Sequence, residues 1–255
     1  MSLVLSLFPG VGLLDRAFEE AGFCVVRGPD LLWGGDIGLF HPPAGRFDGV
    51  IGGPPCQRFS QLANLVRHVY GEEKVAPNLI PEYERCVAEA APRWFLMENV
   101  PAAPEPVVVG YVVRSELVAD FWVGGETTRK RRFSFGTADG ARLEVEQRIM
   151  DRTRAPLPAV LASGGRWVPV AIGGSGKPKR KKVRRANGRE ENGYIYGAKT
   201  VRFWEEAKLA QGLAPDFDLP GMTVAAKIKA VGNGVPLALG RAIAAAVVRA
   251  VAGVV

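Results

Sequence analysis

A rigid turn around Cys56 is the feature that most restricts how this chain can fold. The sequence Gly52-Gly53-Pro54-Pro55-Cys56 follows an apolar segment at residues 47–51 that has the composition of a buried strand. Glycine lets the backbone bend sharply and approach a ligand, whereas proline fixes φ and removes an N–H donor, so this segment cannot continue a helix or a sheet ladder. A thiol at the carboxyl end of a strand lies where open α/β sheets bind ligands. We therefore interpret Cys56 as a functional residue, although an isolated free cysteine is more often buried and structural.

Strands and helices alternate along the first hundred residues. The helix expected after residue 12 has its apolar side chains at helical spacing, and Gly22 ends it. Such alternation is typical of an α/β fold, in which a parallel or mostly parallel sheet is covered by helices on both faces. The expected strands are residues 4–8, 23–26, 47–51 and 93–97, and the expected helices are 13–21, 80–91, 203–211 and 240–251.

The length of 255 residues allows one full α/β core with a small additional module. From about residue 137 to residue 199 the regular alternation fades, and Pro, Gly and Arg become frequent. We therefore divide the chain into a first domain at 1–139, a small irregular module at 140–200, and residues 201–255, which return to the first domain. No apolar run is expected to reach the roughly 20 residues that span a bilayer, and the N-terminus lacks the basic region of a signal peptide.

The cysteines are few and widely separated. Cys24, Cys56 and Cys86 form no paired motif and are odd in number, which argues against a disulfide framework and against a zinc site. The chain has only two histidines, so we expect no histidine-rich metal site either. This cysteine usage favours a reducing cytoplasm.

The positive charge of the chain is concentrated in one segment. Residues 177–189 hold eight of the 33 basic residues and no acidic residue, so the rest of the chain is close to neutral although the net charge is +7. Such a run suits a polyanion such as a nucleic-acid backbone, and the alternative is a solvated basic loop. The candidate nucleic-acid contacts are Lys177, Lys179, Arg180, Lys181, Lys182, Arg184 and Arg185.

Two further turns place functional groups where strands are expected to end. Phe8-Pro9-Gly10-Val11-Gly12 lies between a strand and a helix, so the backbone can approach a ligand closely and a helix N-terminus faces it. Glu98 follows an apolar strand, as Cys56 does, and a carboxyl group at that edge can exchange a proton with a ligand. Taken alone, the first segment is also compatible with a structural turn, and Glu98 with a loop-capping role.

Several blocks of this sequence resemble the cytosine-C5 DNA methyltransferases, and they follow one another along the chain in the same order as in that family. The catalytic Pro-Cys-Gln core of that family, with Phe-Ser after it, is similar to residues 55–60, and its Phe-x-Gly-x-Gly block is similar to residues 8–12. The Gly-Asp-Ile, Glu-Asn-Val and Gly-Asn-x-Val-Pro blocks are similar to residues 35–37, 98–100 and 232–236.

The arginine block of the family, Gln-x-Arg-x-Arg, resembles residues 127–131. Setting Phe133 on the aromatic position of the family selects Arg129 and Arg131, whereas a shift by one residue selects Lys130 and Arg132. Thr127 replaces the usual glutamine, so a side-chain amide is missing. A generic basic surface strand is the alternative interpretation of this segment.

The resemblance implies a Rossmann-like class I methyltransferase sheet with a small target-recognition module at 140–200. It implies an enzyme that transfers a methyl group from S-adenosylmethionine to C5 of a flipped-out cytosine in duplex DNA, through a covalent adduct between Cys56 and C6. Glu98 would act on cytosine N3, and Arg129 and Arg131 would complete the catalytic site. The implied cofactor-binding residues are Phe8, Gly10, Gly12, Asp30, Asp36, Pro54, Asn233 and Gly234, and further DNA contacts are Gln57, Arg58 and Ser60.

Asp30 and Asp36 are unusually close together for this family. An acid near the end of the second strand holds ribose hydroxyls in Rossmann-like sheets, and Asp30 is the nearest candidate. Only five residues separate it from Asp36, whereas the family normally has a helix there, so we expect that helix to be absent.

The thiol of Cys56 is expected to need a nearby cation that stabilises the thiolate, for which Arg58 and Arg131 are candidates. The segment at residues 58–78 could close over the DNA.

Two other functions fit parts of this pattern. A cytosine methyltransferase of the same family that acts on tRNA would carry the same Cys56 turn, and a catalytically inactive DNA-binding homologue would keep the fold. The basic segment favours duplex DNA over tRNA, and the presence of Cys56 and Glu98 disfavours an inactive homologue. We expect a monomer without metal or membrane partners, of the kind found as a phage or solitary bacterial modification enzyme.

Overall fold

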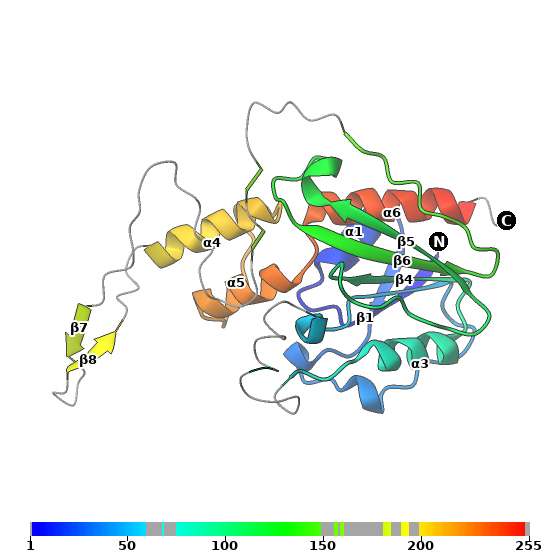
Figure 1. The fold of residues 1–255 in the computed structure, drawn as a ribbon, viewed down its shortest axis with the longest axis horizontal. Helices are drawn as coiled ribbons and strands as arrows, with labels where there is room; N and C mark the ends of the chain where they lie inside the picture. The colour runs from blue at the N-terminus through cyan, green and yellow to red at the C-terminus, as the bar shows by residue number, and fades with distance from the viewer. Residues whose placement is uncertain are drawn as a thin grey trace.

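The computed structural model describes residues 2–59, 68, 75–148, 156–157, 159–160, 181–184, 190–193 and 199–252. Its main feature is a six-stranded sheet with the strand order β2-β1-β3-β4-β6-β5 (Figure 1). β6 alone runs in the direction opposite to the other five strands, so the expectation of a mostly parallel sheet is confirmed. The strands are β1 (Leu3–Leu7), β2 (Cys24–Arg27), β3 (Gly49–Gly52), β4 (Trp94–Asn99), β5 (Val112–Ala119) and β6 (Lys130–Thr137).

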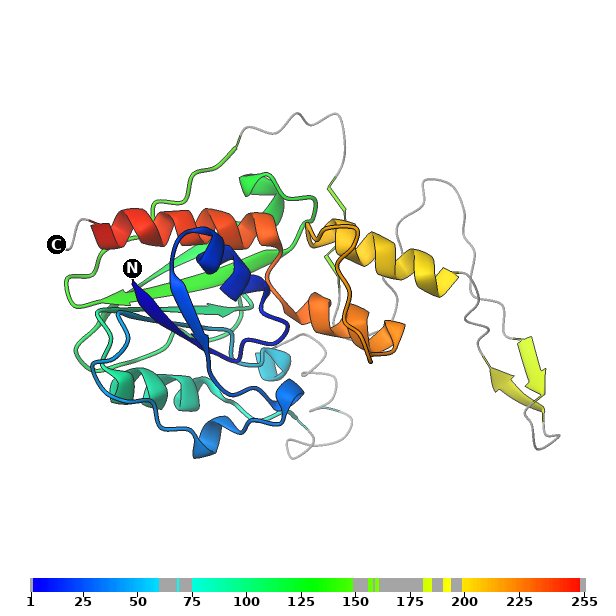
Figure 2. The same cartoon turned by 180° about the vertical axis from the view of Figure 1, so that it is seen from behind.

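Helices cover both faces of this sheet. On one face, α1 (Leu13–Glu20) and α6 (Leu237–Ala252) pack side by side, as the view from behind shows (Figure 2), and they share a core with Val4, Trp94 and Phe135. On the other face, α3 (Ile80–Ala90) buries Tyr83 and Val87 against Leu5, Leu7 and Phe95. The alternation of side chains along β1 therefore supplies one core on each face.

Two helices lie beyond the carboxyl edge of the sheet. These are α4 (Lys199–Ala210) and α5 (Val224–Asn233), which pack together around Trp204 and Val231. The hairpin of β7 (Lys181–Arg184) and β8 (Glu190–Gly193) lies beyond α4, apart from the six-stranded sheet (Figure 1). Short 3₁₀ helices occupy connections: η1 (Leu31–Trp33), η2 (Ile37–Leu39), η3 (Gln57–Phe59) and η5 (Asp120–Val123).

The strands and helices expected from the sequence are present within a few residues of their expected ends. The helix α5 and the strands β5, β7 and β8 were not expected, and β6 corresponds to the basic strand that was given as an alternative interpretation. Part of the segment assigned to a separate module also packs on the sheet domain, because Leu143 lies in the core beside α6 and Val160 lies beside Leu13 and Trp204. Most of residues 149–198 lie outside the described residues, so the division into domains stays a prediction.

One apolar stretch contradicts the expectation that no run is long enough to span a bilayer. Residues Val224–Ala252 have the length and the mean hydropathy, 1.7, of a spanning segment. In the structure this stretch consists of α5 and α6, with a turn at 234–236 between them, and half of the apolar window is buried in the protein. Leu239, Ile243 and Val247 belong to the core of the sheet domain, which explains the apolar composition without a membrane.

Candidate active site

Cys56 and Glu98 meet because they follow neighbouring parallel strands. Gly52, the last residue of β3, pairs in register with Met97, which directly precedes Glu98 in β4. A side chain at Gly53 would bring its Cβ to 2.9 Å from Glu98 Oε2, so glycine is needed for the turn to pass this carboxylate. The Asn99 side-chain amide donates to the carbonyl oxygen of Pro54 at 3.1 Å and ties the two turns together.

Strand β6 brings the arginines to the same edge from the opposite direction. Because it is antiparallel to β4, its beginning lies beside the end of β4, and Arg131 Nε lies 2.7 Å from Glu98 Oε1. Arg132 instead donates to the carbonyl oxygen of Ala103, and the Lys130 ammonium lies over the Trp122 ring, 5.1 Å from its centroid. The structure thus places Arg131 at the Cys56–Glu98 pair, and Lys130 and Arg132 away from it.

The thiol of Cys56 is half-buried in this arrangement. Burial raises the pKa of Cys56, and the negative charge of Glu98 raises it further, whereas the positive charges of Arg131 and Arg129 lower it. The net pKa shift is upward, so the thiol is protonated near neutral pH in the absence of substrate. Of the two cations expected to favour the thiolate, Arg131 does so, while Arg58 donates to the carbonyl oxygen of Ala76 at 3.4 Å.

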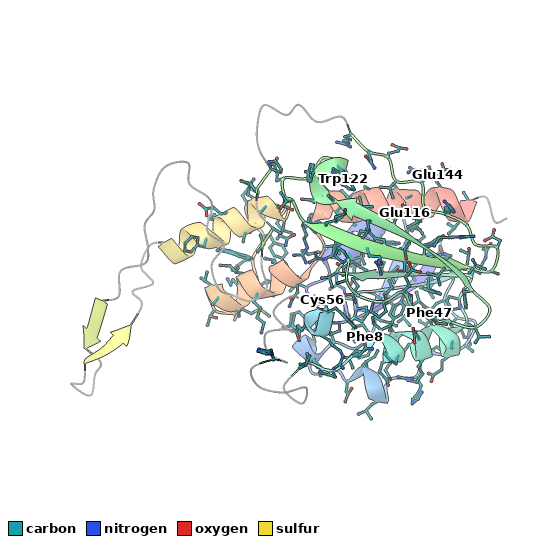
Figure 3. All side chains as sticks on the ribbon, viewed as in Figure 1. Phe8, Phe47, Cys56, Glu116, Trp122 and Glu144 are labelled. Carbon is teal, nitrogen blue, oxygen red and sulfur yellow. The ribbon has the colours of Figure 1, made fainter. Side chains whose placement is uncertain are left out.

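The glycine-rich turn opens onto the same edge of the sheet. Leu7, the last residue of β1, pairs with Gly52 of β3, so the turn at residues 8–12 and the Cys56 turn begin side by side. Figure 3 places the labelled Phe8 and Cys56 at this edge. Phe8 and Gly10 both have φ 55, and no atom lies within 4 Å of the position that a Cβ of Gly10 would take.

The local chemistry of this turn fits an S-adenosylmethionine site. Gly12 begins α1 with no side-chain cap, so the N-terminal amides of the helix remain available to a carboxylate. Open space beside Gly10 lets a ligand approach the backbone. Asp30 holds the turn in place, because its Oδ2 accepts a hydrogen bond from the Gly10 amide at 2.8 Å.

Three contacts at the glycine-rich turn involve residues that the sequence did not single out. The Trp33 indole nitrogen donates to the carbonyl oxygen of Gly10 at 2.7 Å. The buried carboxylate of Asp15 accepts from the Ser6 hydroxyl at 2.5 Å and from Arg27 Nε at 2.9 Å. Burial raises the pKa of Asp15, although Ser6 and Arg27 oppose this. An acid in the first turn of a helix after a glycine-rich turn was the available signal for this network.

The last block of the chain packs against the glycine-rich turn, as its resemblance implied. A Cβ on Gly234 would lie 2.8 Å from Leu13 Cδ1, at the start of α1. The Gln211 side-chain amide donates to the carbonyl oxygen of Val231 at 2.7 Å, and the Leu237 amide donates to the carbonyl oxygen of Gln211. The described side chains of this block therefore lie beside the proposed cofactor residues, and Asn233 is exposed there.

Arg129 holds the site together rather than presenting its guanidinium to a base. It is 4% exposed, and it donates to the carbonyl oxygens of Val160, Gly232 and Asn233 at 3.1, 2.8 and 3.3 Å. Burial lowers the pKa of Arg129, and the positive charge of Arg131 lowers it further. Its terminal nitrogens bind backbone oxygens of two distant segments, so we propose a positioning role for Arg129, and its assignment as a catalytic side chain stays a prediction.

Replacing Arg129 with glutamine is expected to destabilise the protein by about 3 kcal/mol or more, because two buried carbonyl oxygens and one partly buried carbonyl oxygen lose a charged donor. Urea unfolding of the variant measures this loss. Arg46→Gln, which makes the same change at an exposed residue, serves as the control and is expected to stay within about 0.5 kcal/mol of the wild type. An Arg129→Gln variant that unfolds at the wild-type urea concentration would show that the hydrogen bonds from Arg129 to the three carbonyl oxygens do not stabilise the protein.

Thr127 has a structural role at the position where the family has glutamine. Its hydroxyl and its amide both donate to Asp120 Oδ2, at 2.8 and 2.9 Å, and the side chain is 1% exposed. Burial raises the pKa of Asp120, while the hydrogen bonds from Thr127 lower it. Thr127 therefore stabilises the connection from η5 to β6 and does not supply a side chain to a ligand.

The predicted DNA contacts are only partly within the described residues. Gln57 and Arg58 lie in η3 directly after Cys56. Asp36, a predicted cofactor-binding residue, is exposed and directly precedes η2. Ser60, Lys177, Lys179, Arg180 and Arg185 lie outside the described residues, as does most of the segment 58–78. The backbones of Lys181, Lys182 and Arg184 form β7. No group of three or more potential metal-ligating side chains occurs in the described part of the chain.

Comparison with known proteins connects this site to one family. Residues 35–106 match the family model of the C-5 cytosine-specific DNA methylases. The chain is 34% identical to the type II methyltransferase M.FnuDI of Fusobacterium nucleatum over 113 residues, covering 38% of this chain and 32% of that protein. It is 29% identical to M.MthTI of Methanothermobacter thermautotrophicus over 173 residues, covering 56% of this chain and 51% of that protein.

Solved structures show the same fold along the whole chain. A proposed DNA modification methyltransferase encoded within an E. coli prophage has a TM-score of 0.61 at 18% identity, covering 99% of this chain and all of the other. The methyltransferase EhMeth of Entamoeba histolytica has a TM-score of 0.57 at 13% identity, covering 98% of both chains. The fold is thus the Rossmann-like methyltransferase fold expected from the sequence.

The chain matches about a third of the length of the first curated relatives. The matched region contains the Gly35-Asp36-Ile37, Cys56 and Glu98 blocks, and the structure brings Cys56 and Glu98 to one edge of the sheet. The family match at residues 35–106 and the similarity to type II methyltransferases support the assignment of this chain to the C-5 cytosine-specific DNA methylases.

Proposed function

We propose that this chain transfers a methyl group from S-adenosylmethionine to C5 of a cytosine in duplex DNA. The observation that carries this proposal is the cluster of Cys56, Glu98 and Arg131 beside the glycine-rich turn. Relatives named as type II methyltransferases support the substrate class. We further infer a monomer that acts on DNA in the cytoplasm of a bacterial or phage-infected cell.

The chemistry follows from the electronic structure of cytosine. C5 is a poor nucleophile while its electrons belong to the aromatic ring. Addition of the Cys56 sulfur to C6 breaks this conjugation, and protonation of N3 near Glu98 leaves an enamine whose C5 is nucleophilic. After methyl transfer, loss of the C5 proton to a base expels the thiolate from C6 and restores the ring.

The residues of this chain have separate tasks in that scheme. Glu98 exchanges a proton with N3, and Arg131 fixes the orientation of the Glu98 carboxylate. The residues proposed to hold S-adenosylmethionine, which supplies an electrophilic sulfonium methyl group when bound, are Phe8, Gly10, Gly12, Asp30, Asp36, Pro54, Asn233 and Gly234. Because Cys56 is half-buried, the target base has to leave the duplex stack to reach it.

The raised pKa of Cys56 adds a requirement to the reaction. A protonated thiol is a weak nucleophile, so the proton has to leave as the base binds. The charges of Arg131 and Arg129 already favour the thiolate, and removal of water from the closed site strengthens their effect. We therefore expect thiolate formation to accompany base binding rather than to precede it.

Transfer of a labelled methyl group from S-adenosylmethionine tests this function. Unmethylated duplex DNA and tRNA are offered separately, and the labelled nucleoside is identified by mass spectrometry. Label at cytosine C5 of DNA supports the proposal. Label on tRNA alone would move the activity to RNA, and no label on either substrate by folded protein would favour an inactive DNA-binding homologue.

Neutralising the basic segment is expected to weaken DNA binding without changing the chemistry. A variant with Lys179, Arg180, Lys181 and Lys182 replaced by glutamine loses up to four phosphate contacts. The slope of log affinity against log salt should then become shallower by about 0.9 for each lost contact. Fluorescence anisotropy of labelled duplex DNA at several salt concentrations measures this, and an unchanged slope would remove the segment from the DNA interface.

A further inference from the structure

We propose that Arg85 is a positioning residue that holds the adenosine-binding part of the cofactor site in place of a missing helix. This inference rests on the proposed function, since it concerns the segment that contains Asp36, the residue that the family resemblance implies to contact the adenine of the cofactor. Residues 28–48, all of which the structure describes, connect β2 to β3 with the 3₁₀ helices η1 and η2 and no α-helix. Another contact must therefore fix the segment that carries Asp36.

At η2, the local contact that sets the backbone conformation is made by the side chain of Asp36. The carboxylate of Asp36 accepts a hydrogen bond from the Gly38 amide at 2.9 Å and so begins η2. Ile37 is buried at 6% exposure, while Leu39 is 81% exposed. A three-residue 3₁₀ helix with one buried side chain has little intrinsic stability, because such helices are short and have poor hydrogen-bond geometry.

Arg85 supplies the missing connection from α3. Its Nη2 donates to the carbonyl oxygen of Ile37 at 2.8 Å, and its Nη1 donates to the carbonyl oxygen of Phe40 at 3.0 Å. Ile37 is the first residue of η2 and Phe40 directly follows its last residue, so a single guanidinium binds both ends of this helix. A planar fork with several donors can do this, whereas a lysine ammonium lacks the geometry.

Two carboxylates hold the guanidinium in this orientation. Glu82 pairs with Arg85 Nε at 2.9 Å, and Glu89 pairs with Nη1 at 2.9 Å. Both lie on α3, one turn before and one turn after Arg85. The His41 Nδ1 atom also lies 3.0 Å from Glu89, so this carboxylate is itself held by a residue outside α3. Arg85 is thereby restricted to the rotamer that reaches η2.

The consequence for ligand binding follows from the position of η2. Asp36 precedes Ile37 directly, so loosening of Ile37 and Phe40 changes how often Asp36 is placed for adenosine. When the competent position is occupied a tenth of the time, the apparent dissociation constant rises tenfold. Arg85→Gln is therefore expected to weaken binding of S-adenosylhomocysteine and of 5′-methylthioadenosine by the same factor, about tenfold, because both contain the adenosine group.

A double-mutant cycle with Asp36→Ala tests whether Arg85 acts through this segment. Titration calorimetry measures both compounds with wild type, Arg85→Gln, Arg85→Lys, Asp36→Ala and the double variants, and Arg46→Gln is the matched control for charge in the same connection. We expect Arg85→Gln to cost about tenfold in the wild-type background and less than about twofold with Asp36→Ala. Arg85→Lys, which keeps the charge without the fork, is expected to resemble Arg85→Gln.

Several results would overturn the inference. Unchanged affinity in Arg85→Gln would remove Arg85 from cofactor binding, and an equal loss in the Asp36→Ala background would place its effect elsewhere. Wild-type affinity in Arg85→Lys would show that the positive charge is sufficient and that the paired hydrogen bonds to the Ile37 and Phe40 carbonyl oxygens are not needed. Thermal unfolding confirms that each variant is folded before its affinity is interpreted.

Amide hydrogen exchange without any ligand separates this inference from the proposed function. The amides of residues 37–40 are expected to exchange faster in Arg85→Gln than in wild type, while those of β1 are unchanged. If the wild-type protein binds neither compound, the proposed function fails, and with it the ligand-binding part of this inference. Faster exchange would still establish that Arg85 stabilises η2, and unchanged exchange at residues 37–40 would refute this.

Discussion

Replacing Cys56 with serine is expected to reduce methyl transfer by about 10⁴-fold or more while the fold is retained. A serine hydroxyl has nearly the size of the thiol, but it does not ionise in this site and adds to C6 far more slowly. The half-buried position of Cys56 in a proline-rich turn tolerates this change. Single-turnover transfer from labelled S-adenosylmethionine to duplex DNA measures the loss.

Two controls separate loss of the nucleophile from other causes. Cys24→Ser alters an exposed thiol and should keep wild-type activity. Binding of S-adenosylhomocysteine by Cys56→Ser should also be unchanged, because the glycine-rich turn is intact. With DNA that contains 5-fluorocytosine, wild-type protein should form a complex stable to denaturants and Cys56→Ser should not. More than a tenth of wild-type activity in Cys56→Ser would exclude the covalent route.

Replacing Glu98 with glutamine is expected to slow methyl transfer by about 10²–10⁴-fold, which is the range for loss of a positioned acid or base. The same change should make Cys56 more reactive toward small alkylating agents. The charge of Glu98 raises the pKa of Cys56, so its removal lowers that pKa and increases the thiolate fraction at a given pH. Catalysis and alkylation should therefore change in opposite directions.

Site-specific alkylation followed by mass spectrometry measures the second effect. The rate at Cys56 is recorded from pH 6 to pH 10, and its midpoint should move to lower pH in Glu98→Gln. Glu105→Gln makes the same chemical change at an exposed residue and should leave both rates unaltered. A midpoint that stays in place or moves upward would show that Glu98 does not control the Cys56 thiol.

The parts of this protein that could be predicted from the sequence are those in which local signals agree. Apolar strands that end at Gly52 and Met97 predicted that Cys56 and Glu98 would meet, because neighbouring parallel strands end at one edge. Gly12 and Gly22 likewise marked the ends of α1. Strand β6 was predicted only as an alternative, and as a surface strand, because its first residues, Lys130, Arg131 and Arg132, are basic and obscure the buried apolar pattern that follows.

Contacts between distant segments had no local signal. Arg129 donates to carbonyl oxygens 31, 103 and 104 residues away, so its role depends on how α5 packs and not on neighbouring residues. The same holds for Arg85, which binds η2 from α3 across 45 and 48 residues. In both cases, sequence could identify an arginine near a functional block, but only the tertiary structure shows which carbonyls it binds.

The contact of Gly234 with Leu13 has a consequence for protein synthesis. About 220 residues separate the two positions, and ribosomes add roughly 5–20 residues per second. The segment that contains Gly234 is therefore synthesised roughly 10–45 seconds after the glycine-rich turn. The carbonyl oxygens of Gly232 and Asn233, which accept hydrogen bonds from Arg129, are likewise synthesised about 100 residues after it. We therefore expect a nascent chain to have no competent methyl-donor site until residues 232–234 have been synthesised and have left the ribosome.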